Sequence, residues 1–205
     1  MAHDKLAEIN LELEEKSAET IQELMEKNAE LERLSISDPH TRLYNRRHFD
    51  TYLLKEWYRA QRSHDHISLI LCDLDHFHAY NEAYGYETGN ECIHHVAQVI
   101  AHFTRRPYDI PARYGSKKFA AILPHTDTDG AMIIATGIKD EVEKIAIPHI
   151  KSPIKNIVTV SFGVATVLPE KGKDCAALIA MTEEALCEAK SGGRDRISAK
   201  RAAGI

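Results

Sequence analysis

The feature of this sequence that most restricts its fold is a short connection between two predicted strands. Residues 110–113 and 119–123 have the character of strands, and only residues 114–118 separate them. A connection this short cannot cross over a sheet, so the two strands must run antiparallel. Elsewhere predicted strands alternate with helices. The sequence therefore predicts a mixed sheet and the α+β fold class.

Local patterns predict the other elements of the same domain. Asp38 and Pro39 suit the N-cap and first position of a helix that we expect to run to about Ala60. Further strands are expected at 67–72 and 158–167, and further helices at 77–84, 91–104, 129–143 and 174–190. We expect the glycine-bearing residues 85–90 to connect the first two of these helices.

The first part of the chain has a different pattern. Residues 4–34 contain neither proline nor glycine, and apolar residues recur three and four positions apart. One set is Leu6, Ile9 and Leu13, and a second set in a different heptad phase is Ile21, Leu24, Asn28 and Leu31, so the apolar seam shifts between them. This pattern predicts a coiled coil, and a buried Asn28 favours a coiled coil of two helices. We expect a coiled-coil helix at 1–36 that forms a homodimer, and a domain at 37–205. The alternative is a single helix lying on the domain.

The composition excludes several classes of protein. Of the 205 residues, 43% are hydrophobic, which is enough for a buried core. The net charge of -5 argues against a nucleic-acid partner. Because no apolar run is long enough and the N-terminus is charged, we expect neither a membrane span nor a secretory signal. The four cysteines form no C-x-x-C pair, so we expect reduced thiols and a cytoplasmic location.

Two clusters of polar residues are candidate sites. Asp73 and Asp75 follow the apolar run at 67–72, and two carboxylates at a strand end can hold Mg²⁺ together with phosphate oxygens. The connection at Gly115 allows a close approach of backbone to a ligand, with Lys117 and Lys118 beside it. The alternatives are acidic residues that only cap a strand and an ordinary hairpin with solvated lysines.

A third cluster follows the last predicted helix. Lys190 and Arg194 flank two glycines, where basic side chains stabilise a helix C-terminus and can also contact phosphate. The twelve histidines do not show the spacing of a zinc site. The chain also has neither a nucleophile elbow nor a Walker loop, which excludes serine hydrolases and P-loop ATPases of the usual kind.

Together these motifs resemble the GGDEF family, the diguanylate cyclase domain of bacterial signalling. The resemblance covers about residues 37–198 and rests on separate motifs in one order: DPHTRLYNRR at 38–47, DLDHF at 73–77, NEAYG at 81–85, SFGVA at 161–165 and EALCEAK at 184–190, followed by Gly193 and Arg194. It implies a palm-like, mainly antiparallel sheet flanked by helices, as in nucleotidyl cyclases, preceded by a signalling helix.

The chain departs from the family at its signature. Active members have Gly-Gly-Asp-Glu-Phe where this chain has Gly115, Ser116, Lys117, Lys118 and Phe119. In the family, the acid at the third position and the acid matching Asp73 hold the Mg²⁺ or Mn²⁺ ion that accompanies GTP. An ammonium in place of that acid changes the interaction with a cation by several kcal/mol at about 4 Å and an effective dielectric of about 20.

Because phosphoryl transfer needs that cation, we expect no catalytic residues and no cofactor. Mg²⁺ would bind at Asp73 only if nucleotide binding persists. The resemblance leaves a vestigial nucleotide site made of Asp73, Asp75, Phe77, Asn81, Asn90, Lys190 and Arg194. Lys190 and Arg194 match the family's triphosphate contacts. A further hypothesis pairs Lys117 with Asp73.

The predicted nucleotide site has also lost some of the family's contacts. Asn90 replaces an aspartate that reads guanine, and an amide offers one acceptor with competing donors. His78 stands where the family has a phosphate-facing lysine, and Tyr86 replaces the usual histidine. We therefore expect a lower affinity for guanine.

An R-x-x-D motif precedes the signature. The motif consists of Arg106 and Asp109, and Asp109 lies six residues before Gly115. A motif at this offset resembles the family's inhibitory site for cyclic di-GMP. Arg106 could bind phosphate or a guanine edge, and Asp109 could accept from guanine N–H groups. The alternative is a local salt bridge on a turn.

The resemblance and its departures lead to one functional expectation. We expect a non-catalytic GGDEF protein that is a cyclic di-GMP receptor through Arg106 and Asp109, or an interaction module for a protein partner in that pathway. The alternatives are a diguanylate cyclase with weak residual activity and a dimeric scaffold that binds no nucleotide.

Overall fold

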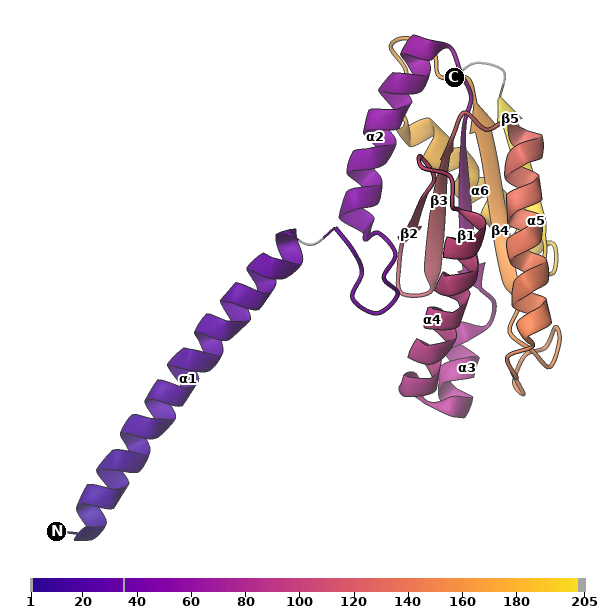
Figure 1. Cartoon of the computed structure of the whole chain (residues 1–205). Coiled ribbons are helices and arrows are strands. Elements are labelled where there is room, and N and C mark those ends of the chain that lie inside the picture. The colour runs from indigo at the N-terminus through magenta and orange to yellow at the C-terminus, as the bar shows by residue number, and fades with distance from the viewer. Residues whose placement is uncertain (1, 35, 203–205) are drawn as a thin grey trace. The chain divides into compact units, whose positions relative to one another are not determined.

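The computed structural model describes the backbone of residues 2–34 and 36–202 (Figure 1). It divides after Ile36 into two units, a helix and a domain. The first unit is helix α1 (Ala2–Leu34). Its described large apolar side chains are all at least half exposed: Leu13, Ile21, Leu24, Met25 and Leu31. The side chains of Leu6 and Ile9 lie outside the described residues.

The domain is built on a sheet whose described strands have the order β2-β3-β1-β4-β5. The strands are β1 (Ile67–Leu74), β2 (Ile110–Arg113), β3 (Lys118–Pro124), β4 (Val160–Val167) and β5 (Ile197–Ala202). Strands β2 and β3 are antiparallel, as predicted from their short connection. Among the named strands of the described residues, only β4 and β5 pair in parallel. The mixed, mainly antiparallel α+β sheet is therefore confirmed.

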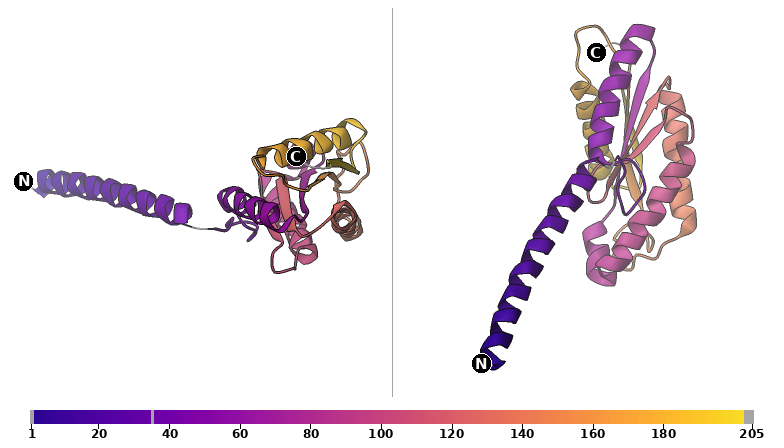
Figure 2. Two further views of the ribbon diagram at one scale, coloured as in Figure 1. Left: turned by 90° about the horizontal axis from the view of Figure 1, so that it is seen from above. Right: turned by 60° about the vertical axis from the view of Figure 1, so that its left-hand side comes forward.

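Helices cover both faces of this sheet (Figures 1 and 2). One face is covered by α3 (Phe77–Tyr84), α4 (Tyr86–Phe103) and α5 (Thr128–Ile145). The other is covered by α2 (Arg46–Ser63) and α6 (Ala176–Ser191). Strand β1 lies between β3 and β4, and all its residues are buried. The central strand therefore brings Asp73 to the end of a two-sided core. None of the described helices is long and apolar enough to span a membrane.

The predicted start of the first domain helix is wrong. Asp38 caps a short turn, where its Oδ1 accepts the backbone N–H and the hydroxyl of Thr41, both at 2.8 Å. Arg42 then adopts a left-handed conformation with φ of 63°, and Tyr44 donates its N–H to the Pro111 carbonyl at 3.1 Å. The chain therefore leaves the turn as an extended segment beside β2. Helix α2 begins only at Arg46.

Two further differences concern α4 and β5. Helix α4 begins at Tyr86 rather than at residue 91, so only Gly85 separates it from α3. Gly89 therefore lies inside α4 and not in a loop. A Cβ at this position would lie 2.0 Å from Asn81 Oδ1, so the close packing of α4 against Asn81 requires glycine. Strand β5 was not predicted. It carries two adjacent charged residues, Lys200 and Arg201, and charged side chains suit an edge strand.

Candidate functional site

A small cavity of about 190 Å³ lies at the end of β1. It is lined by Asp73, Leu74, Asp75, His76, His78, Lys117, Lys190 and Arg194. These residues come from β1 and the turn after it, the β2–β3 hairpin, α3, and α6 with the turn that follows it. The fold therefore brings the three polar clusters of the sequence to one place.

Asp73 is the buried centre of this cavity, with 1% of its surface exposed. Lys117 Nζ lies 3.5 Å from Asp73 Oδ1, so the structure contains the ion pair suggested by the sequence. Lys190 Nζ lies 2.9 Å from Asp73 Oδ2, but without the alignment of a hydrogen bond. Two ammonium groups therefore share one carboxylate.

Asp75 has a different role from Asp73. Its Oδ1 accepts the Ser161 hydroxyl at 2.7 Å, and its Oδ2 accepts the Thr159 hydroxyl at 2.9 Å and the Asp195 backbone N–H at 3.1 Å. These bonds tie the end of β1 to β4 and to the turn after α6. Asp75 therefore connects parts of the fold and has little capacity left for a ligand.

The residues present do not fit a divalent cation. Mg²⁺ needs oxygen ligands, and the charge of Asp73 is already met by Lys117 and Lys190. Over the described part of the chain, no three His, Cys, Asp or Glu side chains are arranged to hold a metal ion.

The turn after α6 is held in place by a network of charges. Asp195 pairs with Lys155 Nζ at 2.7 Å and with Lys139 Nζ at 3.2 Å, and Glu143 pairs with the same two lysines. The neighbouring Arg194 has a left-handed backbone and lines the cavity. Among the described residues, no side chain pairs with its guanidinium. Arg194 is therefore a positioned but unpaired cation.

The residues expected to read guanine lie outside the cavity lining. Asn81 Oδ1 is buried against α4 and has no hydrogen-bond partner, whereas Asn90 is exposed. Phe77 is buried in the core beside Tyr80. His78, at the phosphate-facing position, does line the cavity, but it is exposed and its Nε2 lies 3.2 Å from Glu82 Oε1. Tyr86 is exposed. The structure therefore brings together the residues expected to contact phosphate, but the residues expected to read guanine do not join them.

The R-x-x-D motif forms a turn between α4 and β2. The Asp109 backbone N–H donates to the Arg106 carbonyl at 3.0 Å, but the two side chains form no ion pair. Arg106 is exposed, whereas Asp109 is buried and its Oδ2 has no hydrogen-bond partner. Burial raises the pKa of Asp109, and the nearby Arg106 charge opposes this only in part. The alternative of a local salt bridge is therefore not what the structure contains.

The sequence did not reveal the neighbours of this turn. The Arg59 guanidinium lies 4.9 Å from the centre of the Tyr108 ring, and the Tyr52 hydroxyl donates to the Tyr108 carbonyl at 3.2 Å. Both residues belong to α2. The sequence predicts only that Tyr52 and Arg59 lie on a helix. Nothing in their spacing indicates which loop they contact.

Comparison with known proteins identifies the family. Residues 35–196 match the family model described as "Diguanylate cyclase, GGDEF domain". The chain belongs to the GGDEF family. The curated relatives include diguanylate cyclase VdcA of Vibrio cholerae, which is 32% identical over 178 residues, covering 86% of this chain and 50% of VdcA. The response regulator PleD of Caulobacter vibrioides is 32% identical over 171 residues, covering 82% of this chain and 37% of PleD.

Solved GGDEF structures resemble this chain as well. The crystal structure of the coiled coil and GGDEF domain of DgcB from Caulobacter crescentus, in complex with c-di-GMP, has a TM-score of 0.74 and 29% identity. The match covers 94% of this chain and 99% of that one. Diguanylate cyclase SiaD of Pseudomonas aeruginosa, in complex with its activator SiaC, has a TM-score of 0.71 and 27% identity, covering 98% and 74% of the two chains. The present chain spans about a third to a half of the first curated relatives.

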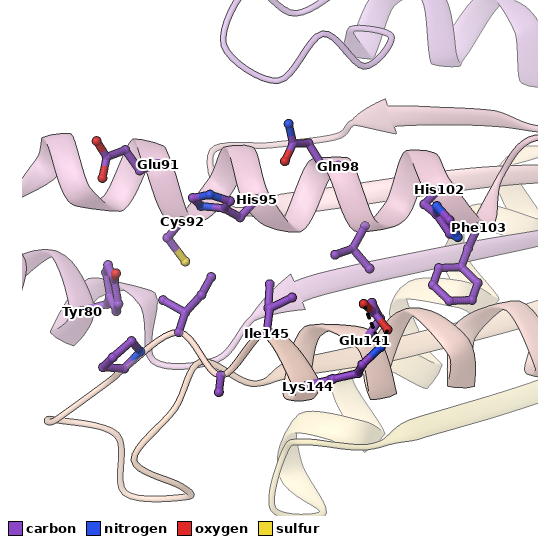
Figure 3. A pocket seen from close by; sticks show the side chains of 14 residues that line it. Tyr80, Glu91, Cys92, His95, Gln98, His102, Phe103, Glu141, Lys144 and Ile145 are labelled. Atoms are coloured by element: carbon purple, nitrogen blue, oxygen red, sulfur yellow. Dashed lines mark hydrogen bonds and ion pairs between the residues drawn. The ribbon is translucent and has the colours of Figure 1, made fainter.

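This GGDEF domain also has a larger groove, of about 830 Å³, between α4 and the end of α5 (Figure 3). Apolar side chains such as Val99, Phe103 and Ile145 line it, with His95 and Glu91 among its polar groups. The groove shares no residue with the Asp73 cavity or with the R-x-x-D turn. No sequence motif pointed to it, because the apolar residues of α4 have the spacing of an ordinary core helix.

Proposed function

We propose that this protein is a non-catalytic GGDEF domain that acts as a cyclic di-GMP receptor through Arg106 and Asp109. The observation that carries the non-catalytic part is the position of Lys117, whose ammonium group lies 3.5 Å from the buried Asp73 carboxylate. Metal-assisted phosphoryl transfer needs a cation beside the developing negative charge. An ammonium group at this carboxylate repels such a cation, so we propose no metal cofactor.

The R-x-x-D turn supports the receptor part. Asp109 holds a buried carboxylate oxygen without a partner. Such a group costs stability, and groups of this kind are found preferentially at functional sites. Exposed Arg106 supplies the donors that a phosphate or guanine edge accepts. The DgcB relative has been crystallised with c-di-GMP. Binding in this chain would require the Asp109 side chain to turn outward.

Calorimetric titration of the full chain with cyclic di-GMP tests the receptor proposal. We expect binding that Arg106→Ala weakens at least tenfold, which corresponds to about 1.4 kcal/mol. The matched control is Arg105→Ala, which removes a neighbouring exposed arginine and should leave the affinity unchanged. Equal affinity of the Arg106→Ala variant and the unmodified chain would refute the assignment.

A parallel titration with GTP and Mg²⁺ separates the alternatives. Turnover of GTP would support a diguanylate cyclase with weak activity and overturn the non-catalytic proposal. Failure to bind either nucleotide would leave a dimeric scaffold or an interaction module for a protein partner. A cytoplasmic location belongs to the same proposal, because that is where the pathway's nucleotide would meet its receptor.

A further inference from the structure

Positive side chains outnumber negative ones around the Asp73 cavity. Lys117, Lys190 and Arg194 line it together with the carboxylates of Asp73 and Asp75. Asp73 alone faces both lysines, and Asp75 is engaged by hydrogen bonds within the fold. One net positive charge therefore remains when the nearby histidines are neutral. A cavity with this charge attracts anions.

The arrangement of these cations suits a chain of phosphate groups. Lys117 and Lys190 approach Asp73 from the hairpin and from α6, and Arg194 adds an unpaired guanidinium from the following turn. Arginine binds phosphate oxygens through its planar fork, and lysine does so as a point charge. The anchoring of Asp195 by Lys139 and Lys155 holds the turn that carries Arg194.

The volume of the cavity limits which part of a ligand it can hold. Whole ligands usually occupy pockets of about 300–1,000 Å³. At about 190 Å³, this cavity is large enough only for a small group. Asn81 and Asn90, which would read a base, do not line it. The cavity is therefore built to recognise phosphate, with any attached nucleoside outside it.

We propose that the Asp73 cavity binds the di- or triphosphate group of a ligand without a divalent cation, and that the Lys117 ammonium replaces that cation. This site is separate from Arg106 and Asp109, so the proposal holds whether or not cyclic di-GMP binds there. Mg²⁺ bound to the ligand neutralises phosphate charge and meets the ammonium groups unfavourably. Added Mg²⁺ therefore leaves binding unchanged or weakens it.

Calorimetric titration of the full chain with sodium tripolyphosphate in EDTA, at fixed ionic strength, tests this proposal. We expect binding in EDTA that Lys117→Gln weakens at least tenfold. Lys118→Gln is the matched control, because it removes the same charge from the adjacent residue, which does not line the cavity. We expect this control to change the affinity by less than about threefold, and circular dichroism confirms that both variants are folded.

Three further titrations complete the test. ATP and GTP in EDTA should show the same dependence on Lys117, and equal affinities would mean that phosphate alone is recognised. A clear preference for GTP, still lost in Lys117→Gln, would identify a guanine nucleotide as the source of the phosphate. In Lys117→Glu, added Mg²⁺ should strengthen binding. Binding to the unmodified chain only with Mg²⁺, or unchanged binding in Lys117→Gln, would overturn the proposal even if cyclic di-GMP binds at Arg106.

Discussion

Two buried aspartates of this domain have opposite surroundings. Asp73 lies between two ammonium groups, whereas Asp109 has a carboxylate oxygen with no partner. Burial of a charge is costly unless an opposite charge or hydrogen bonds compensate for it. The charge of Asp73 is therefore balanced within the fold, and that of Asp109 remains a cost that a ligand could relieve.

Replacing Asp109 with asparagine should therefore stabilise the domain at neutral pH. Burial raises the pKa of Asp109 in the folded state, so the folded protein binds this proton more tightly than the unfolded chain does. The stabilisation that protonated Asp109 contributes is fully present below the pKa of this group in the unfolded chain. It is lost as the pH rises through the pKa of Asp109 in the folded protein. At pH 7 we expect Asp109→Asn to raise the free energy of unfolding by about 1 kcal/mol.

Urea unfolding at several pH values measures this effect. The gain in Asp109→Asn should shrink as the pH falls from 7 toward the unfolded pKa of about 3.9. Asp140→Asn, at an exposed position of α5, is the control and should change stability by less than about 0.5 kcal/mol throughout. A loss of stability in Asp109→Asn at pH 7 would show that the carboxylate has a partner in the folded protein.

At the scale of elements, the contact between β4 and α6 is the closest backbone packing at any described glycine. A Cβ at Gly163 would lie 2.2 Å from the Thr182 carbonyl oxygen and 2.4 Å from the Leu186 nitrogen. Both are backbone atoms of α6, so no side-chain rotation relieves the clash. The SFGVA motif thus reflects a strand that needs glycine to receive this helix.

Gly163→Ala should therefore be strongly destabilising. Because α6 must move away from β4, we expect a loss of about 3 kcal/mol or more in the free energy of unfolding. Gly115→Ala is the matched control, since the nearest atom to its added Cβ, Lys118 Cβ, is 3.6 Å away. Urea unfolding of both variants checks this, and a loss below 1 kcal/mol in Gly163→Ala would contradict the packing argument.

Elements were predictable where their signal is local. The strand at β1 and the antiparallel hairpin follow from apolar runs and a short connection. The predictions failed where a distant partner decides the conformation. Asp38 has the chemistry of a helix cap, yet the chain that follows its turn is extended and hydrogen-bonded to β2. Gly89 suggests a loop, yet it packs inside α4 against Asn81.

The candidate site shows the same division. The meeting of Asp73 with Lys117 and Lys190 could be inferred from the order of family motifs. The structural use of Asp75 could not, because its partners Thr159 and Ser161 lie just before and within β4, more than 80 residues along the chain. Local sequence carries no information on such contacts.

At the scale of the whole molecule, α1 leaves an apolar stripe uncovered. The described stripe includes Ile21, Leu24 and Leu31, which are at least half exposed. A helix with one exposed apolar stripe gains stability by pairing with another. The DgcB structure that matches this chain is of a coiled coil and a GGDEF domain. A dimer through α1 remains a prediction.

Sedimentation of the full chain at tens of micromolar tests the dimer. We expect a dimer that Leu24→Glu converts to a monomer, because it places a charge in the seam. Gln22→Glu adds a charge at an exposed position beside the seam and should remain dimeric. A monomeric unmodified chain would rule out pairing through α1.

We propose above all that Lys117 excludes the cation that GGDEF catalysis needs. Chromatographic measurement of cyclic di-GMP formed from GTP and Mg²⁺ by the purified full chain tests it most directly. We expect no product above the protein-free blank, at any Mg²⁺ concentration. Steady formation of cyclic di-GMP that disappears in Asp73→Asn would contradict it.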